Sequence, residues 1–270
     1  MYLTRHLTPQ GIRWARDGHV IVETFSLSSL LSLSAKDMLA TLEGLSTGEN
    51  LKEHLLAPIE SEQEVWASGV TYLRSREARK LESEVGDVYE KVYDATRPEL
   101  FFKAPGWRVQ GEQQPLRIRR DSDWNVPEPE LVLLLNSQME IVGYCAGNDM
   151  SSRSIEGENP LYLPQAKVYN GSCGLGPGIL LSSADQMRSL PIALSIYRNN
   201  TLIFHDEVST VQMKRTLEEL ASYLGQELAF PRGAFLMTGT GIVPPDQFSL
   251  QPGDQVHIQV GSLALHNPVA

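Results

Sequence analysis

The sequence predicts a mixed α+β fold, rich in β-strands, in which a small N-terminal domain precedes a larger body. From Glu64 onward, short apolar segments recur between turn residues, as is typical of successive strands. Only two charged stretches with helical periodicity interrupt them, at about 75–93 and 211–225. The length of 270 residues is compatible with one β-rich domain or with two domains. The lighter pattern at the start favours two, which we place at 1–60 and 61–270.

The elements follow from local patterns. In the N-terminal part, HVIVETF (19–25) predicts a short strand and SAKDMLATLEGL (34–45) predicts a helix. Asn199 and Asn200 predict a two-residue hairpin turn, because asparagine tolerates positive φ. The segments of the body that we expect to be strands are EVWASGVTY (64–72), ELVLLLN (130–136), EIVGYCAGNDMS (140–151), GILLS (178–182), ALSIYRNNTLIFHDE (193–207), AFLMTGTG (234–241) and DQVHIQV (254–260).

The composition disfavours several classes of function. A formal net charge of −10 and a pI near 5.1 argue against a phosphate backbone as the main partner. No apolar run approaches the roughly 20 residues of a membrane span, and the start lacks the apolar core of a signal peptide. Cys145 and Cys173, the only cysteines, predict buried, reduced residues, with one disulfide left open. We therefore expect a cytoplasmic protein that binds neither nucleic acid nor membrane.

Two glutamates stand one residue apart in VPEPELVLLL, directly before a branched apolar run. Residues i and i+2 of a strand share a face with Cα atoms about 7 Å apart, so Glu128 and Glu130 point the same way. Pro129 between them has no N–H donor and fits a strand start, an edge or a bulge. Asp149 ends a second apolar segment, and three carboxylates converge if the two strands are neighbours. Such a triad suits Mg²⁺, Mn²⁺ or Ca²⁺, although an isolated E-x-E pair is more often two solvated acids.

Lys167 lies in LPQAKVYNGSCGLGP, a stretch with few other charges. A lone lysine of this kind is usually a surface residue with a partly buried stem. Beside a metal and three carboxylates, however, it becomes a candidate acid, base or oxyanion stabiliser.

Five segments, in their order, resemble the fumarylacetoacetate hydrolase family: VPEPELVLLL, IVGYCAGNDMSSRSI, QAKVYNGSCGLGP, FLMTGTG and GDQVHIQVGSLALHNP. The resemblance covers about residues 64–270 and implies a β-roll built mainly of strands. It also implies a divalent metal, usually Mg²⁺, and a substrate whose 2-oxo acid head chelates that metal. The site residues implied by the resemblance are the metal ligands Glu128, Glu130 and Asp149, the family lysine Lys167, and the substrate-contacting threonine Thr240 of TGT.

The chain departs from the hydrolases of this family at one motif. Their carbon–carbon hydrolases typically carry a Tyr-x-x-His-x-x-Glu pattern, whose histidine and glutamate activate water. Here VTYLRSREARK places Ser75 and Ala78 at those two positions, and no histidine occurs between His54 and His205. A serine cannot replace imidazole as a base near neutral pH, so the hydrolytic dyad is missing.

The segments GVTYLRSREAR, RPELFFKA, NDMSSRSIEGENPLYLPQAK and TGTGIVPP resemble a dehydratase-like subgroup similar to 2-keto-3-deoxy-D-arabinonate dehydratase. This implies an Mg²⁺-dependent lyase of pentose catabolism, which converts a 2-keto-3-deoxy sugar acid to a semialdehyde such as 2,5-dioxopentanoate. Lys167 and Glu99 are the expected acid and base, and the apolar LFF after Glu99 can raise its pKa. Arg74 and Ser75 are expected to contact the substrate. Glu99 and Arg74 also fit plainer interpretations as surface residues.

Other functions stay open at this point. The nearest are an acylpyruvate-type hydrolase, which the missing histidine disfavours, and a 2-oxo acid decarboxylase. A non-catalytic module for metal or sugar-acid binding is a third, disfavoured because binding alone does not require Lys167. The expected ligand is a small 2-oxo sugar acid, and the expected assembly is a homodimer or homotetramer.

Overall fold

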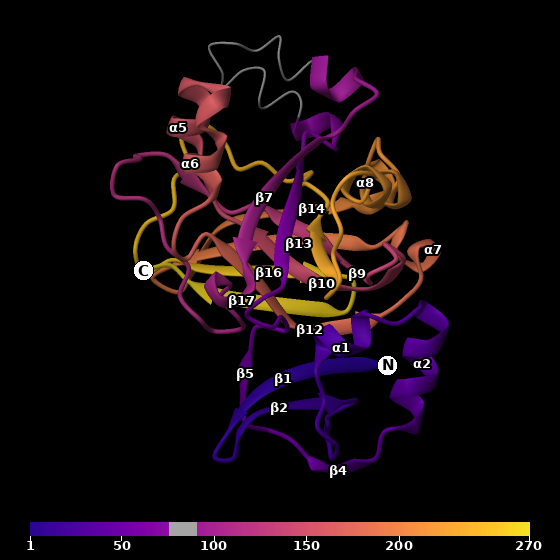
Figure 1. The fold of residues 1–270 in the computed structure, drawn as a ribbon. Helices are drawn as coiled ribbons and strands as arrows, with labels where there is room; N and C mark the ends of the chain where they lie inside the picture. Colours follow the sequence, from indigo (N-terminus) through magenta and orange to yellow (C-terminus); the bar gives the residue numbers. More distant parts are fainter. Residues whose placement is uncertain (76–90) are drawn as a thin grey trace.

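The structure, a computed structural model, describes residues 1–75 and 91–270 (Figure 1). Its described strands are β1 (Tyr2–Thr8), β2 (Gly11–Arg16), β3 (His19–Ile21), β4 (Thr47–Asn50), β5 (His54–Leu56), β6 (Glu64–Gly69), β7 (Glu99–Pro105), β8 (Asn125–Val126), β9 (Pro129–Leu135), β10 (Ile141–Asp149), β11 (Ser151–Ser152), β12 (Cys173–Leu181), β13 (Pro191–Arg198), β14 (Thr201–Ser209), β15 (Ala234–Met237), β16 (Gln255–Val260) and β17 (Leu263–Pro268). Its described helices are α1 (Leu27–Leu31), α2 (Ala35–Gly44), α5 (Arg153–Glu158), α6 (Leu163–Lys167), α7 (Ala184–Met187) and α8 (Leu217–Leu224), with 3₁₀ turns η1 (Gly106–Arg108), η2 (Pro160–Tyr162) and η3 (Thr210–Gln212).

The strands form one large sheet and two smaller ones. The large sheet has eleven strands in the order β4-β3-β2-β1-β12-β10-β9-β15-β6-β7, with β5 paired to β1. A four-stranded sheet, β14-β13-β16-β17, crosses the middle of the molecule, and β11 pairs with β8 (Figure 1). The predicted β-rich α+β class is confirmed.

Strand β9 lies at the centre of the large sheet and is buried along its whole length. Leu131, Leu133 and Leu135 face a core that they share with the four-stranded sheet. Val132 and Leu134 point the opposite way, into a second core. Because both faces of β9 are covered, its sequence is a continuous apolar run instead of an alternating one.

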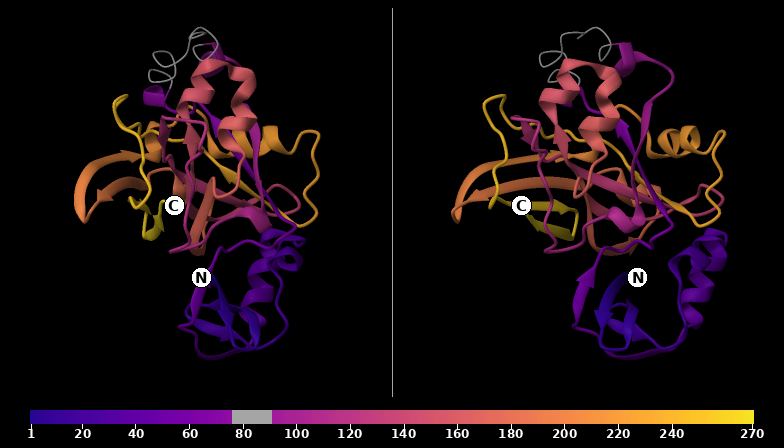
Figure 2. Two further views of the ribbon diagram at one scale, coloured as in Figure 1. Left: turned by 90° about the vertical axis from the view of Figure 1, so that its left-hand side faces the viewer. Right: turned by 60° about the vertical axis from the view of Figure 1, so that its left-hand side comes forward.

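The N-terminal strands extend the large sheet at the end opposite α5 and α6 (Figures 1 and 2). Strand β1 pairs antiparallel with β12, with Tyr2 opposite Leu180. The second core joins side chains of both parts, including Leu3 and Trp14 from the N-terminal part and Val65 from the body. A domain boundary near residue 60 stays a prediction.

Several predicted elements are confirmed with shifted ends. The helix at 34–45 is α2, which begins after Ser34 because the Ser34 side chain accepts the Asp37 N–H. The strand at 19–25 ends already at Ile21. The helix predicted at 211–225 begins only at Leu217, after Thr216 caps it. The helix predicted at about 75–93 falls largely on 76–90, outside the described residues.

Other expectations concern turns and thiols. Asn199 and Asn200 form the hairpin turn between β13 and β14 with φ of 51° and 62°, as predicted. Cys145 and Cys173 are free and buried, and burial raises the pKa of Cys173 to about 12. Within 1–75 and 91–270, no helix has the length and apolar character needed to cross a membrane.

Candidate active site

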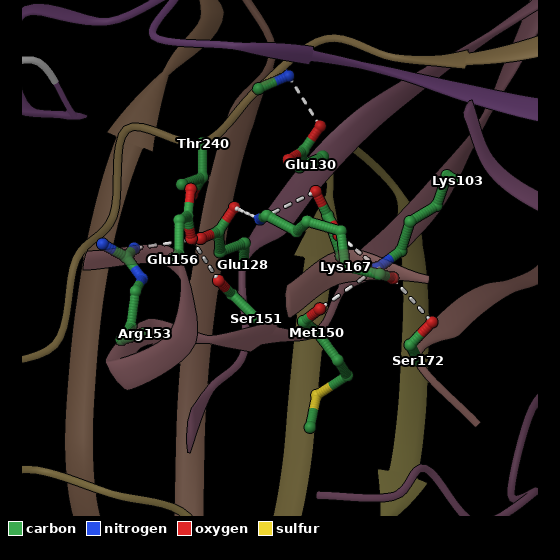
Figure 3. A network of polar contacts seen from close by, with 12 residues as sticks. Lys103, Glu128, Glu130, Met150, Ser151, Arg153, Glu156, Lys167, Ser172 and Thr240 are labelled. Carbon is green, nitrogen blue, oxygen red and sulfur yellow. Dashed lines mark hydrogen bonds and ion pairs between the residues drawn. The ribbon is translucent and has the colours of Figure 1, made fainter. Parts of the chain in front are cut away.

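The predicted carboxylates meet where β9 begins and β10 ends (Figure 3). Glu130 lies opposite Gly147 on β10, and the Glu128 carbonyl accepts the Asp149 N–H at 3.0 Å. Pro129 is the first residue of β9, beyond the part of the strand that pairs with β15, so its missing N–H leaves no gap there. Oxygens of Glu128, Glu130 and Asp149 all lie within 4.8 Å of one another.

These carboxylates fit a divalent cation. Each is at most 3% exposed, and buried carboxylates are costly unless a cation, a proton or hydrogen bonds compensate them. Burial, followed by the charges of Asp149 and Glu128, raises the pKa of Glu130 well above 4.5. The Gly239 N–H donates to Glu130 Oε2 at 2.6 Å, and this hydrogen bond partly lowers the pKa of Glu130 again. Three converging carboxylate oxygens are the kind of ligand set that hard cations prefer.

Three buried cations surround the acids. Lys167 Nζ lies 2.7 Å from Glu128 Oε2 and 3.0 Å from Asp149 Oδ2. Arg153 contacts Glu128 Oε1 at 2.9 Å, and Lys103 contacts Asp149 Oδ1 at 2.5 Å. Lys167 is 2% exposed and also lies 5.9 Å from the centroid of the Phe101 ring. The surface interpretation of Lys167 is therefore wrong.

A small pocket, with a cavity volume of about 20 Å³, opens beside these charges. Its lining residues include the expected Glu99, Ser75, Glu128, Asp149, Lys167 and Thr240, together with Gly69, Phe101, Glu156 and Leu163. Arg74 is exposed and is not among the described residues that line the pocket. The structure thus brings together all the predicted site residues except Arg74, with Glu130 reaching the group through the carboxylate cluster.

Glu99 reaches the pocket from β7, at the far edge of the large sheet. It pairs with Gly69 of β6, and a Cβ built at Gly69 would lie only 2.0 Å from Glu99 Oε2. The absence of a side chain at Gly69 therefore makes room for the Glu99 carboxylate. Glu99 is half-buried, which a turn on the surface would not require.

Two hydroxyl groups of the pocket are held by nearby backbone. Thr240 accepts the Ile242 N–H at 3.2 Å, and Ser75 Oγ donates to the Tyr72 carbonyl at 2.8 Å. Gly239 adopts φ of +90°, and a Cβ there would meet Thr71 Oγ1 at 2.1 Å. A glycine between the two threonines of TGT is needed for this turn, which aims the Gly239 N–H at Glu130.

The sequence analysis missed three charged residues of this cluster: Lys103, Arg153 and Glu156. Glu156 lies in α5 and accepts a hydrogen bond from Ser151 at 2.7 Å. A signal existed for Lys103, because Glu99, Phe101 and Lys103 alternate along β7 and all three face the site. No local pattern separated Arg153 from an ordinary helix-start arginine.

The raised pKa of Glu130 predicts a pH-dependent response to metal. As pH rises above 4.5, Glu130 of the unfolded chain loses its proton while the folded protein retains it, so the stability of the metal-free protein falls. A divalent cation relieves this cost because it binds the ionised carboxylate. We expect the rise in melting temperature on adding Mg²⁺ to EDTA-treated protein to be larger at pH 8 than at pH 5.5. An equal rise in melting temperature at the two pH values would contradict this prediction. So would a Glu130→Gln variant that shows the same difference between pH 8 and pH 5.5.

Comparison with known proteins shows a matching family model and two similar curated proteins. A family model described as fumarylacetoacetate (FAA) hydrolase C-terminal matches residues 64–270. A "Probable 2-keto-3-deoxyxylonate dehydratase" from Haloferax volcanii is 46% identical over 208 residues, covering 77% of this chain and 71% of the relative. The "2-dehydro-3-deoxy-D-arabinonate dehydratase" from Saccharolobus solfataricus is 43% identical over 208 residues, covering 74% of this chain and 69% of the relative.

Solved structures extend the likeness to the whole chain. The apo form of 2-keto-3-deoxy-D-arabinonate dehydratase superposes with a TM-score of 0.85 at 32% identity and covers 100% of this chain and 98% of its own. A structure of the dehydratase complexed with magnesium and 2,5-dioxopentanoate has a TM-score of 0.83 at 33% identity, with coverage of 100% and 98%. The predicted β-roll is thereby confirmed. From the match over 64–270 and these relatives, the chain belongs to the fumarylacetoacetate hydrolase family.

Proposed function

We propose that this protein is an Mg²⁺-dependent dehydratase of a 2-keto-3-deoxy sugar acid. The two curated relatives are named for dehydratases of such acids, and a similar structure contains magnesium and 2,5-dioxopentanoate. The proposed reaction removes water from a 2-keto-3-deoxypentonate of the arabinonate type and yields 2,5-dioxopentanoate. In this proposal Glu128, Glu130 and Asp149 hold Mg²⁺.

The observation that carries the proposal is that Lys167 and Glu99 line the same pocket as the carboxylates. When bound, Mg²⁺ supplies a Lewis acid that withdraws electron density from a 2-oxo acid and so acidifies its C3 protons. Of Lys167 and Glu99, one removes a C3 proton and the other protonates the departing C4 hydroxyl. Loss of water leaves a C3–C4 double bond. A proton then leaves C5 and another adds at C3, and the resulting C4–C5 enol tautomerises to the C5 aldehyde.

The remaining pocket residues suit a short hydroxylated acid. Thr240 and Ser75 offer hydroxyl groups, and Phe101 and Leu163 are apolar. Lys167 holds a positive charge next to the carboxylates, where it can steady negative charge that develops on the 2-oxo group.

We further infer a cytoplasmic enzyme of pentose catabolism that assembles as a homodimer or homotetramer. The acidic chain and its two free, buried cysteines support the cytoplasm as its compartment. The names of the relatives support the catabolic role. Light scattering of the purified protein measures the assembly directly.

The deciding experiment is a product assay with a panel of 2-keto-3-deoxy acids, in Mg²⁺ and in EDTA. We expect 2,5-dioxopentanoate from a 2-keto-3-deoxypentonate in Mg²⁺ and none in EDTA. Under the same conditions we expect no useful hydrolysis of acylpyruvates, because Ser75 cannot act as the base that a histidine provides. Efficient release of pyruvate from an acylpyruvate would contradict the dehydratase assignment and indicate a hydrolase. Efficient release of CO₂ from a 2-oxo acid would instead indicate a decarboxylase.

A further inference from the structure

Lys103 is a completely buried lysine whose ammonium group contacts three oxygens (Figure 3). Its Nζ lies 2.5 Å from Asp149 Oδ1, 3.1 Å from the Met150 carbonyl and 2.5 Å from the Lys167 carbonyl. The ammonium donates hydrogen bonds to the two carbonyls and forms an ion pair with the Asp149 carboxylate, which balances its charge. Burying such a charge is costly unless it is fully paired, and here it is.

The three oxygens belong to the two segments that carry the site. Asp149 and Met150 close the end of β10, and Lys167 is the last residue of α6. The Lys167 carbonyl is one of the groups that a helix leaves without an internal partner at its C-terminus. Lys103 and Ser172, whose Oγ donates to the same carbonyl at 2.9 Å, supply that partner. A cation in this place also interacts favourably with the end of a helix.

Lys103 and Lys167 divide the Asp149 carboxylate between them. Lys103 contacts Oδ1 and Lys167 contacts Oδ2. Rotation of the carboxylate would break the contact with Lys103, so Oδ2 is held on the side of Glu128. Lys103 itself is not among the described residues that line the pocket.

We propose that Lys103 is a positioning residue, which holds the Asp149 carboxylate and the backbone of Lys167 in register for metal binding and proton transfer. The proposal rests on the dehydratase function proposed above. Lys103 acts through Asp149 and Lys167, which line the pocket. A role in packing alone would lower stability and leave the metal affinity of the folded protein unchanged.

The test is Lys103→Met, a change that keeps an unbranched side chain, one atom shorter, and removes its charge. In EDTA-stripped protein titrated calorimetrically with MgCl₂, we expect the Mg²⁺ affinity to fall roughly 10- to 100-fold, as is typical when a partner of a metal ligand is lost. We expect kcat to fall as well, with KM for the sugar acid changed less. Unchanged Mg²⁺ affinity and kcat in folded Lys103→Met would overturn the proposal.

The control is Arg198→Met. Arg198 contacts both oxygens of the buried Asp254 at 2.8 Å, where β13 ends and β16 begins. This variant also removes a cation from a buried carboxylate, so we expect a lower melting temperature with normal Mg²⁺ affinity. A comparable loss of Mg²⁺ affinity in Arg198→Met would mean that general destabilisation explains the effect.

A second variant decides the matter if Lys103→Met does not fold. Ser172→Ala removes the hydrogen bond to the Lys167 carbonyl, together with the longer one, at 3.3 Å, that Ser172 Oγ accepts from the Tyr169 N–H. We expect kcat to fall about 2- to 10-fold, the usual range for one hydrogen bond, at unchanged Mg²⁺ affinity; an unchanged kcat would overturn the proposal. The Mg²⁺ titrations contain no substrate, so they remain decisive for Lys103 even if the wild-type protein turns over no sugar acid and the proposed function fails.

Discussion

Glu128→Gln and Asp149→Asn are expected to abolish dehydration. They should also weaken Mg²⁺ binding by more than the roughly 100-fold that is typical when a residue hydrogen-bonded to a metal ligand is lost. Each change removes one of the three charges that a divalent cation would neutralise, at a position that is at most 3% exposed. The backbone contact between Glu128 and Asp149 does not involve the changed atoms, so the fold is retained. Calorimetric titration with MgCl₂ and the product assay measure the two effects.

A surface acid provides the control for this prediction. Asp185→Asn changes an exposed carboxylate that pairs with Arg188, far along the chain from the triad. We expect it to leave both activity and Mg²⁺ affinity intact. Full activity in Glu128→Gln or Asp149→Asn would remove the carboxylate triad from the mechanism.

Lys167→Met is expected still to bind Mg²⁺ and substrate and to lose on the order of 10²- to 10⁴-fold in kcat, the usual contribution of a general acid or base. The reason is that the triad keeps its three carboxylates while the pocket loses its proton-transferring ammonium. Glu99→Gln should behave in the same way, because a Gln amide has nearly the same shape as the carboxyl group and cannot act as an acid or base near neutral pH. Steady-state kinetics and direct binding separate the two parameters.

Exchange of the C3 protons with deuterated solvent then assigns the two roles. The variant that still exchanges these protons but no longer eliminates water has lost the acid. The variant that does neither has lost the base. If both variants lose substrate binding with kcat intact, Lys167 and Glu99 only position the sugar acid, and the acid–base pairing is wrong.

The fold was predictable where local pattern and burial agree. The apolar runs of β9 and β10 are continuous because neighbouring strands and two cores cover both faces. The hairpin at Asn199 and Asn200 was predictable because positive φ restricts the residue types. Strands β1, β2 and β7 were not predicted, since they are short, mix polar and apolar residues without regular alternation, and depend on pairing with distant partners.

By itself, the sequence determined the metal-type carboxylate pair, the candidate lysine and the family resemblance, because an i, i+2 spacing in a strand puts Glu128 and Glu130 on one face whatever surrounds them. Only the tertiary structure decided which charges share a buried site. Lys103 lies far along the chain from Arg153 and Lys167, and whether an ammonium or guanidinium is buried depends on carboxylates supplied by other segments. Arg74, in contrast, is exposed to solvent. The sequence around an arginine at the start of a helix does not show whether a buried carboxylate lies within its reach.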